Sequence, residues 1–175
     1  PSDRGISRQT FLRGAVGVLA TGAVFGTTRA AADPAAPSGW NGLASTIGGS
    51  VVLPANGAQY SSGKQVFNSF YNNSNPAAVV TVSSQSDVQK AVTFAAANNL
   101  KVAPRGSGHS YIGASSANGT MVLDLRALPG GAHLDGGNVT VTPATNLYAV
   151  HQACASAGRA IPSGSCPTVG VAGLA

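Results

Sequence analysis

Runs of β-branched and other apolar residues along the chain predict short, buried strands. An uninterrupted apolar run suits a strand that is covered on both faces, and turn residues bound each of these runs. Residues 77–82 have this buried pattern, and four further segments read as strands: 50–54, 100–103, 120–125 and 138–142. The sequence therefore predicts five strands, all of them after residue 49.

Two segments show the spacing of a helix instead. Ser86-Asp-Val-Gln89 is a capping box, with a hydroxyl at the N-cap and a glutamine three residues later, and apolar residues then recur at helical spacing as far as Ala95. Asn98-Asn99 predicts the end of this helix, because asparagine tolerates the left-handed backbone conformation. A second helix is predicted over 147–156, with Gly158 as its stop.

The order of these segments indicates the fold class. Residues 77–103 read as strand, helix and strand, a βαβ unit that implies parallel strands joined by a right-handed crossover. The later strands and helix do not repeat this unit. The class is therefore α+β, or α/β with mixed sheets.

Residues 1–32 have the pattern of an export signal. Arg4, Arg8 and Arg13 precede an uncharged stretch, 14–28, and Ala30-Ala31-Ala32 offers a small-residue cleavage site. The stretch is short and rich in glycine, so we expect no stable membrane anchor. Residues 33–75 then lead into a domain at 76–175.

The export route follows from one short motif. Ser7-Arg8-Gln9-Thr10-Phe11-Leu12-Arg13 resembles a twin-arginine signal, with Gln9 in place of the second arginine. An ordinary secretory signal is the alternative. The chain also lacks an initiator methionine and stops within a glycine-spaced apolar run, so we expect it to be part of a longer protein.

Charge excludes one class of partner. The whole chain has a formal net charge of +5, but cleavage after residue 32 leaves six basic against four acidic residues, a net charge of +2. No stripe of lysine or arginine remains to follow a phosphate backbone, so the sequence does not indicate a nucleic-acid-binding protein.

Two glycine-punctuated loops carry the candidate chemistry. In Arg105-Gly-Ser-Gly-His109 the glycines allow positive φ and leave no Cβ in the way of a ligand. Successive amides in such a turn form an anion-binding nest that suits a pyrophosphate, and Arg105, Ser107 and Ser110 add donors. A tight surface turn is the alternative, and the loop is not a Rossmann fingerprint. The second loop, Ser165–Gly170, presents the nucleophile Cys166.

The cysteines and histidines leave alternatives open. A Cys154–Cys166 disulfide suits an exported chain, although Cys154 falls within the predicted helix. His133 is placed in a solvated turn between two glycine pairs, and His151 lies on the helix without an evident partner. Their spacing predicts no metal site.

Three segments together resemble a known family. Arg105-Gly-Ser-Gly-His-Ser-Tyr-Ile-Gly113, Val122-Leu-Asp-Leu125 and Gly164-Ser-Cys-Pro-Thr-Val-Gly-Val-Ala-Gly173 are similar to the berberine bridge enzyme-like branch of the vanillyl-alcohol oxidase/p-cresol methylhydroxylase (PCMH) flavoproteins. The resemblance implies an incomplete PCMH-type FAD-binding domain over 76–175. Its sheets would be a small parallel βαβ sheet and a mixed or antiparallel second sheet.

The resemblance also implies the cofactor and its ligands. FAD would be bonded covalently to His109 and Cys166. The full set of implied cofactor-binding residues is Arg105, Gly106, Ser107, Gly108, His109, Ser110, Gly113, Cys166, Pro167, Thr168, Val169, Gly170 and Gly173. The family's catalytic base falls outside this chain, so no catalytic residue is assigned here.

The implied activity is that of an exported FAD-dependent oxidase. It would oxidise an alcohol, sugar or secondary metabolite by hydride transfer to the flavin and then to O2. Two alternatives remain: a dehydrogenase of the same fold that uses another acceptor, and a non-enzymatic exported domain with a Cys154–Cys166 disulfide. This chain alone is expected to be inactive and to bind FAD weakly.

Overall fold

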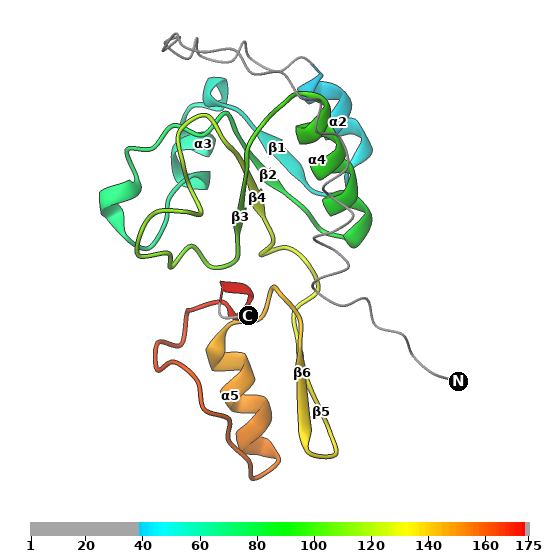
Figure 1. Ribbon diagram of the computed structural model, residues 1–175, viewed down its shortest axis with the longest axis vertical. Coiled ribbons are helices and arrows are strands. Elements are labelled where there is room, and N and C mark those ends of the chain that lie inside the picture. The colour runs from blue at the N-terminus through cyan, green and yellow to red at the C-terminus, as the bar shows by residue number, and fades with distance from the viewer. Residues whose placement is uncertain (1–38, 174–175) are drawn as a thin grey trace, which may run out of the picture. The chain divides into compact units, whose positions relative to one another are not determined.

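The computed structural model describes residues 39–173, so the predicted export signal lies outside the described residues. A four-stranded sheet with its helices precedes a two-stranded hairpin with one helix (Figure 1). The helices are α2 (Trp40–Thr46), α3 (Ala58–Gly63), α4 (Gln85–Ala97) and α5 (Leu147–Ser156). The strands are β1 (Ser50–Val52), β2 (Ala78–Thr81), β3 (Val102–Arg105), β4 (Met121–Asp124), β5 (Ala132–Asp135) and β6 (Asn138–Val141). Short 3-10 turns lie at Pro54–Asn56, Ser69–Tyr71 and Val171–Gly173. The α+β class is confirmed.

The main sheet has the order β1-β2-β4-β3. Strand β1 runs antiparallel to β2, whereas β2 and β3 each pair in parallel with β4. The two strands of the predicted βαβ unit are therefore parallel, but β4 lies between them. The gap left by the β2–α4–β3 crossover is filled by a strand from later in the chain.

Alternation along the strands divides the core between the two faces of this sheet, because successive side chains in a strand point to opposite sides. Val80 of β2 and Leu123 of β4 pack in one cluster with Ala91 and Ala95 of α4 and with residues of α2. Their neighbours Val79 and Val122 belong to the cluster that Tyr60 of α3 covers. Both faces are thus closed, which explains the uninterrupted apolar runs.

The helix α4 begins two residues earlier than its sequence indicated. Ser84 is its N-cap, with extended backbone and a side chain that accepts the Asp87 N–H at 3.1 Å, so the predicted cap at Ser86 is wrong. Asp87 fixes this start, because its carboxylate accepts the N–H groups of Ser83 and Gly48. Those bonds, the one from Ser83 first, hold the pKa of Asp87 well below its usual range. The predicted end is confirmed, with Asn98 as C-cap and Asn99 at φ +52°.

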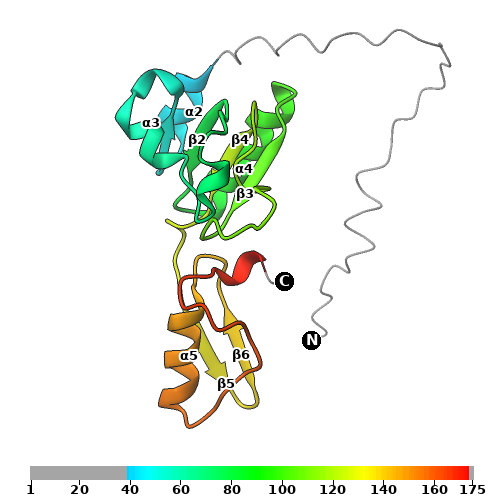
Figure 2. The same cartoon turned by 90° about the vertical axis from the view of Figure 1, so that its left-hand side faces the viewer.

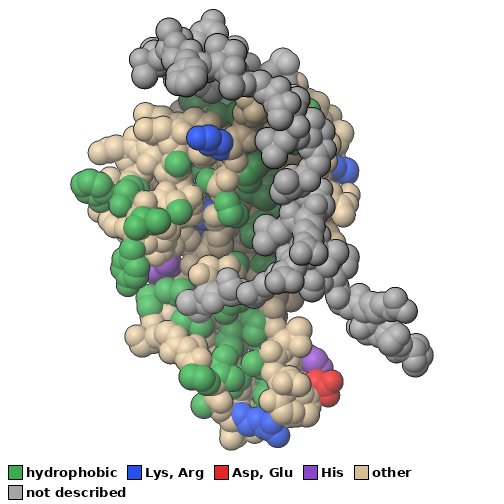
Figure 3. All heavy atoms as spheres, in the orientation of Figure 1, with side chains coloured by type: hydrophobic (Ala, Val, Ile, Leu, Met, Phe, Trp, Pro, Cys, Tyr) green, Lys and Arg blue, Asp and Glu red, His purple; other side chains and the backbone are tan. Residues whose placement is uncertain are grey.

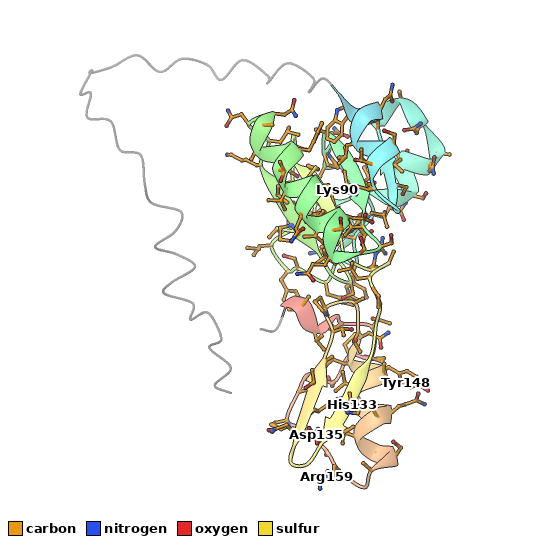
Figure 4. All side chains as sticks on the ribbon, turned by 90° about the vertical axis from the view of Figure 1, so that its right-hand side faces the viewer. Lys90, His133, Asp135, Tyr148 and Arg159 are labelled. Atoms are coloured by element: carbon orange, nitrogen blue, oxygen red, sulfur yellow. The ribbon has the colours of Figure 1, made fainter. Side chains whose placement is uncertain are left out.

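Strand β5 replaces the turn predicted around His133. It pairs antiparallel with β6, and Asp135 opposite Asn138 leaves only Gly136-Gly137 to close the hairpin. Gly136 has φ +56°, as a tight hairpin turn requires. His133 and Asp135 lie on this strand, and Arg159 donates a hydrogen bond to the Gly136 carbonyl at 2.7 Å (Figure 4).

Helix α5 packs along the hairpin, on the β5 side (Figure 2). It has the bounds that the sequence predicted, and Gly158 follows it at φ +64°. Asn146 caps its start by accepting the Ala149 N–H at 3.0 Å. None of the helices in the described part of the chain is long and apolar enough to cross a membrane.

Candidate functional site

A cleft of about 600 Å³ lies at the end of the main sheet where parallel β3 and β4 finish, as ligand sites in open sheets of this kind commonly do. The loop after β3 forms one wall and the loop after α5 forms another. Its lining residues are Gln65, Val66, Phe67, Gly106, Ser107, His109, Arg126, Pro143, Ala144, Asn146, Thr168 and Gly170. Five of these belong to the set predicted from the sequence.

The side chain of Arg105 lies beneath the loop rather than in the cleft. It is 1% exposed, and Nη2 donates to Asp124 Oδ2 and to the Gly63 carbonyl, both at 2.7 Å. The cause is the strand register, which places Arg105 directly beside Asp124. Its guanidinium therefore joins the sheet to the end of α3. The contact with a phosphate that we predicted for Arg105 is wrong.

Arg126 supplies the positive charge of the cleft, although the residues predicted from the sequence to bind the cofactor do not include it. Its Nε and Nη2 hold both oxygens of Asp124 at 2.6–3.1 Å, yet its side chain remains 52% exposed. The signal was available, because a cation two residues beyond a buried strand falls at the carboxyl edge of a parallel sheet.

Arg105, Asp124 and Arg126 form a network of ion pairs in which Arg105 and Asp124 are buried and Arg126 is half-exposed. Burial acts to raise the pKa of Asp124, but hydrogen bonds and charge from Arg126 and Arg105 outweigh it and hold that pKa below its ordinary value. The hydrogen bond to Asp124 raises the pKa of Arg126, which is opposed by partial burial. Two guanidinium groups paired with one carboxylate leave a net charge of about +1, and Arg126, which lines the cleft, places this charge there.

The glycine loop after β3 presents free backbone donors. Gly108 has φ +79°, and its carbonyl accepts the Phe67 N–H at 3.1 Å. The N–H groups from Ser107 to Ile112 make no hydrogen bond to another group in the described part of the chain. Such consecutive donors beside a cation suit an anionic ligand.

The loop after α5 is held against the glycine loop by backbone contacts. The Gly170 N–H donates to Ser107 Oγ, and a Cβ at Gly170 would lie only 3.0 Å from the Ser107 nitrogen. On its other side this loop accepts two N–H groups from the first turn of α5, through the carbonyls of Val169 at 2.9 Å and Pro167 at 3.1 Å. Glycine at position 170 therefore permits the two loops to meet.

His109 and Cys166 converge on one hydroxyl group. Thr168 Oγ1 lies 3.0 Å from His109 Nε2 and 3.5 Å from Cys166 Sγ. The His109 ring stacks on Phe67, with the ring centroids 4.1 Å apart and the planes 23° apart. Cys166 does not line the cleft itself but lies next to Thr168, which does.

Both cysteines are free thiols in the structure, with Cys154 buried in α5 and Cys166 half-buried in its loop. Hydrogen bonds lower the pKa of the Cys166 thiol, that from the Thr168 side chain most of all, then those from the backbone of Thr168 and Val169. His151, for which the sequence indicated no partner, bonds through Nε2 to Ser163 Oγ at 2.6 Å.

The remaining predicted residues shape the loops instead of lining the cleft. Ser110 Oγ accepts the Ala114 N–H at 3.1 Å. Gly113 has φ +68°, and a Cβ there would collide with the Tyr71 ring. Gly173 ends the last 3-10 turn. The roles predicted for these residues in cofactor binding stay predictions.

A family described as an FAD binding domain matches residues 76–175. The chain belongs to this family. The earlier resemblance to berberine bridge enzyme-like flavoproteins is also confirmed, because the Physcomitrella patens BBE-like 1 structure matches 77% of this chain with a TM-score of 0.67 and 28% identity. The structure of 6-hydroxy-D-nicotine oxidase from Arthrobacter nicotinovorans matches 71% of the chain with a TM-score of 0.65 and 26% identity.

Two proteins with similar sequences are also flavin-dependent oxidoreductases by name. The FAD-linked oxidoreductase ZEB1 of Gibberella zeae is 32% identical over 101 residues, or 54% of this chain and 18% of its own length. The VAO-type flavoprotein oxidase VAO615 of Thermothelomyces thermophilus is 30% identical over 106 residues, or 56% of this chain and 18% of its own. The two solved structures are covered to 29% and 27% of their lengths. The chain thus spans less than a third of each of these proteins.

The residues of the cleft fit FAD. The volume of about 600 Å³ lies within the range of cofactor sites. Free N–H groups and Arg126 match a pyrophosphate. Of the two nucleophiles, His109 lines the cleft, and Cys166 lies next to Thr168, which also lines it.

Proposed function

We propose that this chain supplies part of the FAD cradle of an oxidoreductase in which the flavin is bonded to both His109 and Cys166. The observation that carries the proposal is their convergence on Thr168, from loops 57 positions apart in sequence. Family membership supports FAD as the cofactor. Bound FAD would accept hydride from a substrate C–H bond next to oxygen or nitrogen and pass the electrons to an acceptor.

The chain's own residues would bind and orient the cofactor. The N–H groups of the glycine loop and Arg126 would hold the pyrophosphate, while Gly106 and Gly170 let the two loops that carry His109 and Cys166 approach each other. Each covalent bond would replace one hydrogen on the flavin and one on the side chain. The two protons and two electrons released per bond would pass to O2, giving hydrogen peroxide.

We propose an oxidase acting on an alcohol, a sugar or a secondary metabolite, with O2 as the acceptor. The names of VAO615 and of 6-hydroxy-D-nicotine oxidase support oxidase activity. A dehydrogenase with a different acceptor is the second candidate. It is favoured by the grass pollen protein Phl p 4, described as having glucose dehydrogenase activity, which is 25% identical to this chain with a TM-score of 0.60. Oxygen consumption during turnover distinguishes the two.

We further propose that the protein is exported by the twin-arginine route, on the residue pattern of 1–32. Cofactor insertion before export would suit a route that carries folded proteins. The proposal can be tested by fusing residues 1–38 to a reporter that is active only when folded before export. Transport that stops when Arg8 becomes lysine supports this route, whereas unchanged transport contradicts it.

The experiment for covalent attachment is peptide mapping of the full-length protein by mass spectrometry. We expect one flavin that joins the His109 peptide to the Cys166 peptide and survives acid precipitation. His109→Ala and Cys166→Ala should each leave the flavin on the other peptide only, and the double variant should release it. His133→Ala, an exposed histidine on β5, is the matched control and should keep the cross-link. A wild-type protein without flavin-linked peptides would overturn the proposal.

A further inference from the structure

The hydroxyl of Thr168 lies between the two candidate attachment residues and bonds to both. Its Oγ1 is 3.0 Å from His109 Nε2 and 3.5 Å from Cys166 Sγ, distances suited to N–H···O and O–H···S hydrogen bonds. The contact partners are held in place independently. Phe67 stacks on the imidazole, and the first turn of α5 binds the carbonyls on either side of Thr168.

A threonine hydroxyl has one hydrogen to donate, and this limits the protonation states it can join. When Cys166 is a thiolate, the hydroxyl must donate to sulfur, so its oxygen accepts from His109 Nε2–H. The neutral imidazole then carries its free lone pair on Nδ1. When Cys166 is a thiol, its S–H can donate a hydrogen bond to the Thr168 oxygen. The Thr168 hydroxyl is then free to donate its own hydrogen to His109 Nε2. A neutral imidazole that accepts at Nε2 carries its proton on Nδ1.

We propose that Thr168 is a positioning residue that couples the ionisation of Cys166 to the tautomer of His109, so that both side chains become nucleophilic together. The inference rests on the proposed function, in which both residues attack the flavin. Thr168 itself forms no bond to the cofactor. Its hydroxyl sets which atoms of its two neighbours are free to react.

The surroundings of Cys166 support this assignment. The Thr168 side chain is the largest cause of the lowered pKa of the thiol. Other titratable or charged groups nearby are Tyr148 and His151 on α5, and His109 and Arg126 across the cleft. Among described residues, Tyr148 bonds to Gln152, His151 to Ser163 and Arg126 to Asp124, so no hydrogen bond joins these three to the sulfur. Thr168 is exposed, so its replacement should not disturb folding.

The test uses full-length protein from riboflavin-starved cells, in which Cys166 is free. Alkylation by iodoacetamide is followed against pH, with the Cys166 peptide quantified by mass spectrometry. Thiolate is the reactive form, so a lowered pKa makes Cys166 react at lower pH. Thr168→Val should move the midpoint to higher pH and slow alkylation at pH 7 at least about threefold, with an unchanged rate at high pH. Thr168→Ser should restore the wild-type profile.

The imidazole provides the second readout. Nitrogen NMR of histidine-labelled protein should show His109 protonated on Nε2 once Cys166 ionises, and this dependence should disappear in Thr168→Val. An unchanged thiol midpoint in Thr168→Val, or an imidazole that ignores Cys166, would overturn the coupling.

Flavin loading separates this inference from the proposed function. Adding FAD to the apo-protein should give covalent attachment that is slower at pH 7 in Thr168→Val than in wild type. If wild type itself forms no flavin-linked peptide, the proposed function fails, while the thiol and imidazole titrations still decide the role of Thr168. If wild type and Thr168→Val load at equal rates over the whole pH range, the coupling has no part in attachment and the inference is contradicted.

Discussion

Arg105 and Arg126 share the carboxylate of Asp124 but differ in exposure, 1% against 52% for the side chains. The buried guanidinium of Arg105 is shielded from water and instead forms the ion pair with Asp124 and hydrogen bonds to two backbone carbonyls. The exposed one keeps access to solvent and to the cleft. One carboxylate thus anchors a structural cation and positions a cation for a ligand.

This difference gives a paired prediction. Arg105→Met should lower the free energy of unfolding by about 3 kcal/mol, because it breaks a buried ion pair. Arg126→Met should cost under about 1 kcal/mol, since half-exposed pairs contribute little. Chemical denaturation measures both. The ranking should reverse for FAD retention before covalent attachment, where Arg126→Met is the weaker binder per folded molecule. Equal FAD binding by the two variants would remove Arg126 from the proposed cradle.

The sequence could predict the loop but not the direction of its first side chain. Gly106 and Gly108 mark a tight turn whatever the surrounding fold. Whether Arg105 points into the cleft depends on the register of β3 against β4, and no local pattern encodes the pairing with Asp124. Thr168 was expected to contact the cofactor, but its place between His109 and Cys166 needed the tertiary structure.

At the scale of elements, the start of α4 allows a direct comparison of two serines. Ser84 accepts the Asp87 N–H, whereas Ser86 lies exposed inside the first turn. Ser84→Ala should therefore destabilise the protein by about 1 kcal/mol, and Ser86→Ala should change its stability little. Thermal unfolding of the two variants measures the difference. A larger loss in Ser86→Ala would contradict the observed cap.

Elements with local stop signals were predictable, and those defined by distant partners were not. Helix α5 matched its predicted bounds because Asn146 caps it and Gly158 ends it. Strand β5 was missed because glycine pairs at both ends, Gly130-Gly131 and Gly136-Gly137, indicated a turn. The insertion of β4 between β2 and β3 was equally invisible, since strand order is decided by packing across the whole sheet.

At the scale of the whole molecule, several large apolar side chains are exposed, one of which, Phe67, lines the cleft. Phe67 and Phe70 are 68% and 79% exposed, and Tyr111 and Ile112 are 90% and 79% exposed. Hydrophobic groups reach the surface at the left of the space-filling view (Figure 3). Exposed apolar area of this kind favours association.

We therefore expect the 175-residue chain on its own to self-associate and to bind FAD weakly. Replacing Phe70 and Ile112 by serine should reduce the association seen in sedimentation velocity. Replacing Val92, which is 45% exposed on α4, serves as the control and should change it little. Tight, stoichiometric FAD binding by this chain alone would contradict the expectation.

The meeting of the two loops has a thermodynamic consequence if both bonds form. A flavin attached at His109 and Cys166 closes a covalent ring that contains the 57-residue separation between them. In a chain-entropy description, a cross-link over a loop of this length restricts the unfolded state by about 4 kcal/mol, as a disulfide would. Loss of either bond opens the ring completely, so the two single variants should lose the same amount of this cross-link stabilisation, and the double variant should lose no more of it. The cofactor would then stabilise the folded protein as a covalent cross-link, in addition to its redox role.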